Sequence, residues 1–287
     1  MNYTFRPAVL FVLCIGVFLV TGACNGRKGP VLEGFCGSAG KPALEECARA
    51  FEEKTGIRVN LHFSGSGTML AKLKMSKKGD FYIPGSPDYM ARARKEGIVI
   101  PETESKVAYL VPAILVPAGN PGEVRELPDL AGHESELGIG NPRAVCVGLY
   151  AVEVLEENGL LDDVRVRIAV QARSCSATAS LAAMDQVDAI LGWRVFGKWQ
   201  PKKIDIVSLE SGNIPRLAYI PAAVSTYSDN RELVERFIGF LNSPQGREIF
   251  TEWGYAATER AAREYAPNAD IGGRYELPAA FTSGNDL

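Results

Sequence analysis

After Gly34 the sequence changes repeatedly between a helical and a strand periodicity. In residues 41–56, KPALEECARAFEEKTG, apolar residues recur at i, i+3, i+4 and i+7 and would line one face of a helix. In residues 57–63, IRVNLHF, every second residue is apolar, as in a strand with one buried face. Residues 80–97 repeat the order of strand and helix. This alternation predicts an α/β fold with a mainly parallel sheet.

Two longer apolar stretches divide the rest of the chain. Residues 108–119, AYLVPAILVPAG, and residues 215–225, PRLAYIPAAVS, have the character of long strands, and a second α/β run lies between them. We therefore predict two α/β lobes joined by two crossing strands, with a ligand cleft between the lobes. The predicted domains are a signal peptide at 1–23, a lipidated linker at 24–30, lobe 1 at 31–110 and 222–287 including a C-terminal tail, and lobe 2 at 111–221.

The N-terminus has the pattern of an export signal. Arg6 precedes an apolar run at residues 8–20, and the small residues of VTGAC end at Cys24. The run is shorter than a membrane-spanning helix requires. Cleavage before Cys24 and lipidation of that cysteine would anchor the protein, as in bacterial lipoproteins; an ordinary cleaved signal is the alternative. Both interpretations place the protein outside the cytoplasm, in the periplasm or on the outer face of the cytoplasmic membrane.

The net charge excludes one class of ligand, and the cysteines indicate possible disulfides. A formal net charge of −3 argues against nucleic-acid binding, which requires a basic surface. An exported protein can pair its cysteines, and the four of the mature chain permit three complete pairings. These are Cys36, Cys47, Cys146 and Cys175. Because Cys146 and Cys175 each precede a predicted helix of lobe 2, we expect them to be the closest pair.

The segment FSGSGTMLAKL, residues 63–73, joins a predicted strand to a predicted helix through a turn of only serine, glycine and threonine. The first N–H groups of a helix lack partners and carry a partial positive charge. A turn of this kind can therefore hold an anion. A plain N-cap at a tight connection is the alternative.

Six segments, in their order and spacing, resemble the molybdate- and tungstate-binding proteins of ABC importers, which are type II periplasmic binding proteins. The resemblance extends from about residue 31 to residue 255. It implies capture of a tetrahedral oxyanion in the cleft and its delivery to an ABC permease. The segments are FCGSAGKPALEECARAFEEKTGIRV, FSGSGTMLAKL, GDFYIPGSPDYM, IGNPRAVCVGLYAVEVL, VDAILGW and FLNSPQGREIFTEWGY.

The same resemblance implies which residues bind the ligand. Members of this family hold the dianion with uncharged hydrogen-bond donors from turns of both lobes. The corresponding positions are Ser66 with Gly65 beside it, Ser38 or Ala39, the backbone amide of Val147, and Ser176 or Ala177.

One position departs from the family pattern. A family tyrosine that closes the site from lobe 2 falls near Val195, which cannot replace a phenol. Arg143 and Arg194 are candidate substitutes for that donor, although each could instead form a surface ion pair.

The function expected from these observations is anion binding without catalysis. Two isolated histidines, His62 and His133, and no GxSxG or HExxH motif leave few groups for an enzyme or a metal site. We expect a monomer without a cofactor that binds molybdate or tungstate. The alternatives are a binding protein for sulfate, phosphate or a small organic anion, a thiol-dependent exported enzyme, and a lipid-anchored sensor or adhesin.

Overall fold

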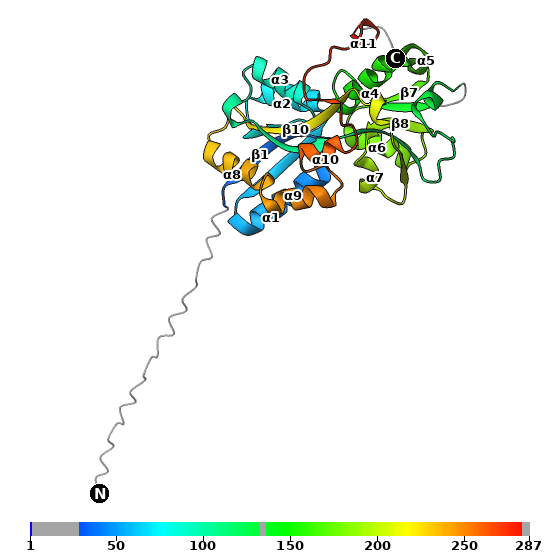
Figure 1. Cartoon of the computed structure of the whole chain (residues 1–287). Coiled ribbons are helices and arrows are strands. Elements are labelled where there is room, and N and C mark those ends of the chain that lie inside the picture. The colour runs from blue at the N-terminus through cyan, green and yellow to red at the C-terminus, as the bar shows by residue number, and fades with distance from the viewer. Residues whose placement is uncertain (2–28, 133–135, 283–287) are drawn as a thin grey trace.

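The computed structural model describes residues 1, 29–132 and 136–282, so the predicted signal peptide, Cys24 and His133 lie outside the described residues. The described strands form two separate sheets, each covered by helices (Figure 1). This arrangement confirms the predicted α/β class with two lobes. None of the helices in the described ranges is long and apolar enough to cross a membrane.

Lobe 1 is built on the sheet with strand order β11-β10-β3-β1-β2, in which β4 also pairs with β10. The strand β1 is parallel to β2 and β3, whereas β10 is antiparallel to β3 and β4. Its strands are β1 (Val31–Gly37), β2 (Arg58–Ser64), β3 (Phe81–Ile83), β4 (Ser105–Leu110), β10 (Arg216–Val224) and β11 (Asp270–Ile271). Its helices are α1 (Lys41–Thr55), α2 (Ser66–Ser76), α3 (Pro87–Lys95), α8 (Arg231–Leu241) and α9 (Pro244–Glu252).

Lobe 2 is built on the sheet with strand order β7-β6-β8-β5-β9, in which β6 is parallel to β7 and β8, and β5 is antiparallel to β8 and β9. Its strands are β5 (Pro112–Pro117), β6 (Leu137–Gly140), β7 (Ile168–Ala172), β8 (Ala189–Trp193) and β9 (Ile204–Val207). Its helices are α4 (Cys146–Glu157), α5 (Leu161–Arg165), α6 (Cys175–Ala183) and α7 (Phe196–Trp199). Four short 3-10 turns complete the two lobes: η1 (Ser38–Gly40), η2 (Pro101–Thr103), η3 (Leu127–Ala131) and η4 (Ser211–Asn213).

Local sequence explains the first elements of lobe 1. Helix α1 has Pro42 in its first turn, where a proline costs no backbone hydrogen bond, and ends at Gly56, which has a φ of 71°. The apolar positions of α1, including Phe51, are buried. The Phe51 ring packs against Phe237 of α8 with ring centroids 5.2 Å apart. The predicted helical face of residues 41–56 is therefore the face that joins the core of lobe 1.

The two long apolar stretches form the connections between the lobes. Residues 108–119 were expected to form one long strand, but β4 ends at Leu110 in the first sheet and β5 begins at Pro112 in the second. The two strands belong to different sheets, so the extended segment is interrupted between Leu110 and Pro112. The second stretch is the single strand β10. The predicted lobe boundaries at residues 110/111 and 221/222 stay predictions, and β10 runs across the second of them.

The segment after residue 257 lies along both lobes. It contains α10 (Glu259–Arg263), β11, and α11 (Ala279–Thr282), which lies at the top of Figure 1, near α5. The strand β11 pairs in parallel with the start of β10. Phe281 is buried in the hydrophobic core of lobe 2. The sequence of this segment gave no such assignment, because its apolar residues follow no helical or strand period.

Candidate functional site

The candidate site lies where helices of the two lobes begin opposite each other. In lobe 1, β1 leads into η1 and β2 leads into α2; in lobe 2, β6 precedes α4 and β7 precedes α6. Neither α2 nor α4 has a side-chain cap on its first N–H groups. Helix N-termini attract negative charge because their first N–H groups have no partner within the helix and stand at the positive end of the helix dipole. The two lobes therefore direct helix N-termini toward one place.

Ser38 links the two lobes directly. Its side chain is buried, and its Oγ accepts a hydrogen bond of 3.1 Å from the backbone N–H of Ser176. The neighbouring Ala39 is also buried, but its carbonyl accepts a bond of 2.6 Å from the Tyr255 hydroxyl. Of the two residues that the sequence left open, the geometry therefore favours Ser38.

Ser66 is the first residue of α2 and is 1% exposed. Its Oγ accepts a hydrogen bond of 3.0 Å from the backbone N–H of Gly85, and its carbonyl accepts one of 2.8 Å from the Tyr82 hydroxyl. Within residues 29–132 and 136–282, neither Ser66 nor Ser38 donates its hydroxyl hydrogen to an acceptor. Both hydroxyls are thus oriented by a backbone donor and keep one hydrogen for an acceptor.

Glycines allow the two lobes to approach closely where β2 leads into α2. The Gly67 N–H donates to the Ala144 carbonyl of lobe 2 at 2.9 Å. A Cβ atom on Gly65 would lie 2.7 Å from that same carbonyl oxygen and 2.9 Å from the Arg173 carbonyl oxygen. Only a residue without a side chain fits there, so the small residues of this turn are required by contact between the lobes.

The predicted lobe 2 positions lie in the first turns of α4 and α6. Val147 is the second residue of α4 and is buried. In α6, the Ala177 N–H donates to the Ser174 hydroxyl that caps the helix, at 3.1 Å, whereas the Ser176 N–H points across to Ser38. Both N–H groups therefore have partners within the protein, and the choice between Ser176 and Ala177 as ligand donor stays a prediction.

The two candidate arginines make other contacts. Arg143 Nε donates to the Phe281 carbonyl at 2.6 Å. Arg194 Nη1 donates to the Ser208 hydroxyl at 2.7 Å, and its guanidinium lies 4.7 Å from the centre of the Tyr265 ring. Val195 is buried at the start of α7 and supplies no polar side chain. These contacts involve neither Ser38 nor Ser66, and a ligand role for either arginine stays a prediction.

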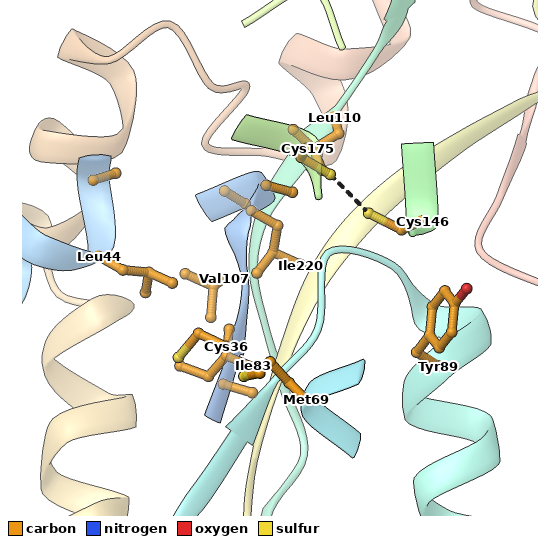
Figure 2. Packing of buried hydrophobic residues seen from close by; sticks show 14 of the residues in the cluster. Cys36, Leu44, Met69, Ile83, Tyr89, Val107, Leu110, Cys146, Cys175 and Ile220 are labelled. Carbon is orange, nitrogen blue, oxygen red and sulfur yellow. Dashed lines mark hydrogen bonds between the residues drawn. The ribbon is translucent and has the colours of Figure 1, made fainter. Parts of the chain in front are cut away.

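Two thiols that the sequence singled out, and buried donors that it did not, lie on or beside the first turns of the lobe 2 helices. The Cys146 and Cys175 sulfur atoms lie 3.5 Å apart at the starts of α4 and α6, next to each other as predicted (Figure 2). Buried side-chain atoms without a hydrogen-bond partner in the described part of the chain include Ser86 Oγ and Tyr150 Oη. Burial raises the pKa of Tyr150 and of Cys175 well above their ordinary values, so both groups stay protonated and can donate.

A buried ionic cluster connects the lobes beside the site. We call Arg216, Asp88 and Glu153 the Arg216 network. Arg216 donates from Nη2 to Glu153 of α4 at 2.6 Å and from Nη1 to Asp88 of α3 at 3.0 Å. The guanidinium also lies 4.1 Å from the centre of the Tyr150 ring. The C-terminal segment completes the network, because Tyr275 N–H donates to Asp88 at 3.2 Å.

The family of bacterial extracellular solute-binding proteins matches residues 32–256, more than half of the 287-residue chain. The chain belongs to this family. The matched region ends before α10. The C-terminal segment, which contains Tyr275 and Phe281, therefore lies outside it.

This solute-binding protein is similar to proteins that bind different oxyanions. It is 22% identical over 245 residues to the molybdate-binding protein ModA of Escherichia coli, covering 83% of this chain and 93% of ModA. The solved periplasmic molybdate-binding protein of Azotobacter vinelandii has a TM-score of 0.70 at 20% identity, covering 79% of this chain and 100% of that one. The sulfate-binding protein SubI of Mycobacterium tuberculosis has a TM-score of 0.68 at 16% identity, covering 85% and 94%. These structures support the fold and leave the ligand open.

Proposed function

We propose that this protein captures a tetrahedral oxyanion, molybdate or tungstate, between its lobes and delivers it to the permease of an ABC importer. The observation that carries the proposal is the hydrogen bonding of the buried Ser38 and Ser66 hydroxyls, which stand where helical segments begin. Each hydroxyl accepts a backbone N–H and retains its own hydrogen for donation. An oxyanion has only acceptors, so it matches a site whose free groups are donors.

The uncharged character of these donors agrees with that ligand. Ser38, Ser66, Val147 and Ser176 carry no formal charge. Fixed dipoles can replace the hydration shell that a dianion loses on binding. Each hydrogen bond to a charged group contributes about 1.5–3 kcal/mol, so several bonds suffice for sub-micromolar affinity after the costs of association. Several directed dipoles can therefore bind a dianion without an arginine in contact with it.

Molybdate and tungstate are expected to bind much more tightly than sulfate. All three ions are dianions near neutral pH, so a helix dipole attracts them almost equally. Selection must then come from donors spaced for the longer metal–oxygen bonds, because a misplaced hydrogen bond loses energy steeply. Isothermal titration calorimetry of ligand-stripped protein with molybdate, tungstate, sulfate and phosphate measures this order. Equal or tighter binding of sulfate would contradict the molybdate assignment and leave oxyanion binding itself in place.

A small organic anion is the second candidate, because a large pocket adjoins the site. The pocket has a volume of about 740 Å³ and lies between α3, the segment before α4 and the C-terminal segment. Tyr89 lines it, and the same ring stands 3.0 Å from where a Cβ of Gly67 would be. Its basic lining residues are Arg92, Lys95, Arg143 and Arg274. Tighter binding of a phosphorylated small acid than of molybdate in the same titration would favour this candidate.

We also propose that Cys24 anchors the protein to the outer face of the cytoplasmic membrane. Cys24 lies outside the described residues, and the proposal rests on the signal pattern and on the extracellular family. Mass spectrometry of the mature N-terminus is expected to show a lipidated Cys24 as the first residue. A Cys24→Ser variant should then be recovered in the soluble fraction. An unmodified N-terminus at another residue would indicate an ordinary cleaved signal.

A further inference from the structure

The oxyanion proposal leaves two buried thiols at the site unexplained. The side chains of Cys146 and Cys175 are 0% and 1% exposed, and all four described cysteines carry free thiols. A disulfide requires an S–S distance of about 2.05 Å. The observed 3.5 Å means that the sulfur atoms need to approach by only about 1.5 Å. Both residues belong to helices of lobe 2, so the bond can form without movement between the lobes.

Lobe 1 covers these thiols. A Cβ atom on Gly85 would lie 2.5 Å from Cys146 Sγ and 2.6 Å from the Ala39 Cβ, so the Gly85 backbone stands directly against the sulfur. The N–H of that same glycine orients the Ser66 hydroxyl. Contact between the lobes thus shields Cys146 from solvent, and the same glycine orients the Ser66 hydroxyl. A hinge movement that separates the lobes would expose the thiols at the N-termini of α4 and α6, where thiolate formation is favoured.

The position of the sulfur atoms ties their oxidation state to the ligand. In the reduced form one thiol donates to the other sulfur, and Cys146 Sγ lies against the Gly85 backbone, whose N–H orients the Ser66 hydroxyl. A disulfide has no S–H group, and its formation draws Cys146 Sγ toward Cys175. Oxidation therefore changes the contact that Cys146 makes with Gly85, and with it the backbone that orients Ser66. An exported protein also meets oxidising conditions in which a nearby thiol pair can bond.

We propose that Cys146 and Cys175 form a reversible dithiol–disulfide pair that is linked to ligand binding. The inference rests on the proposed oxyanion site. Oxidation breaks two S–H bonds and forms one S–S bond, and two electrons and two protons pass to a disulfide oxidant, which becomes two thiols. The ligand holds the lobes together over the thiols and slows their oxidation. By thermodynamic reciprocity, the disulfide weakens ligand binding.

The test starts from the reduced mature protein treated with oxidised glutathione, with and without saturating molybdate. Peptide mass spectrometry is expected to show a linked Cys146–Cys175 pair that forms at least about tenfold more slowly with molybdate present. Calorimetry should show that the oxidised protein binds molybdate roughly tenfold more weakly, and that dithiothreitol restores the affinity. A folded Cys175→Ser variant should retain binding that no longer responds to oxidised glutathione. The control Cys47→Ala, in the core of lobe 1, should respond as the natural protein does.

Several outcomes would overturn the inference. These are a linked pair of Cys36 and Cys47 in place of Cys146 and Cys175, an oxidation rate unchanged by molybdate, or equal affinities of the reduced and oxidised forms. The experiment distinguishes failure of the redox linkage from failure of the proposed oxyanion binding. Reduced protein that binds molybdate, with an affinity insensitive to the disulfide, refutes the linkage and retains the proposed function. Reduced protein that binds none of the four titrated anions refutes the proposed function and the linkage together.

Discussion

Replacing Arg216 with alanine is expected to lower the free energy of unfolding by about 3–5 kcal/mol, because it leaves two buried carboxylates without their partner. Arg216 is 4% exposed, and the side chains of Glu153 and Asp88 are 9% and 10% exposed. For a chain of this size the loss corresponds to a decrease in Tm of roughly 6–20 °C. Thermal and urea denaturation near pH 7 measure it.

Two variants separate lost charge pairing from general damage. Arg231→Ala removes an exposed arginine that pairs with Glu235 on the surface of α8, and its Tm should stay close to that of the natural protein. In the triple variant Arg216→Met, Asp88→Asn, Glu153→Gln no charge is stranded, so it should recover part of the stability that Arg216→Ala loses. If the Tm of Arg216→Ala equals that of the natural protein, the Arg216 network contributes nothing to stability.

The Arg216→Ala deficit should also depend on pH in a defined direction. Burial raises the pKa of Glu153 above its ordinary value, and Arg216 opposes that rise. A carboxyl with a raised folded-state pKa binds its proton more tightly in the folded protein, so ionising it disfavours folding as the pH rises through that pKa. Loss of Arg216 raises this pKa further. The difference in stability between variant and natural protein should therefore shrink as the pH falls from about 7 to about 5.

Replacing Ser66 with alanine is expected to weaken molybdate binding about ten- to a hundredfold. The variant loses one hydrogen bond to a charged ligand, which contributes about 1.5–3 kcal/mol. The Gly85 N–H also loses the Ser66 hydroxyl to which it donates a hydrogen bond. The backbone around the site therefore loses an orienting contact. Calorimetry on the folded variant measures the affinity, and a melting curve checks that the fold persists.

Ser76→Ala is the matched control for Ser66→Ala. Ser76 ends the same helix, is exposed, and its hydroxyl donates to the carbonyls of Leu73 and Lys78. Its replacement should leave molybdate affinity unchanged. If Ser66→Ala binds molybdate as tightly as the natural protein, the oxyanion site lies elsewhere in the cleft.

The sequence by itself determined which elements form and much of which side chains they bury. The periods of residues 41–56 and 57–63 predicted α1 and β2 correctly, because periodicity records which side of an element faces apolar contacts. The serine and glycine turn before α2 was also visible, since few other residues permit that close connection. Likewise, Cys146 and Cys175 were expected together because each precedes a helix of the same lobe.

Only the tertiary structure shows which residue of each adjacent pair contacts the other lobe. Ser38 and Ala39 are adjacent in the chain, as are Ser176 and Ala177, and a shift of one residue in a turn changes which group crosses to the other lobe. The direction of a hydrogen bond depends on backbone orientation, which no local pattern records. The Ser174 hydroxyl, for example, takes the Ala177 N–H and leaves that of Ser176 for Ser38.

The Arg216 network and the C-terminal segment also required the tertiary structure. Arg216 lies 63 positions from Glu153 and 128 positions from Asp88 in the sequence, among many other charged residues. Charged residues on a surface and in a buried cluster look alike in a sequence, because desolvation arises only when distant elements pack together. The sequence therefore determined the two lobes and the small residues between them, whereas packing across the hinge decided which charges join them.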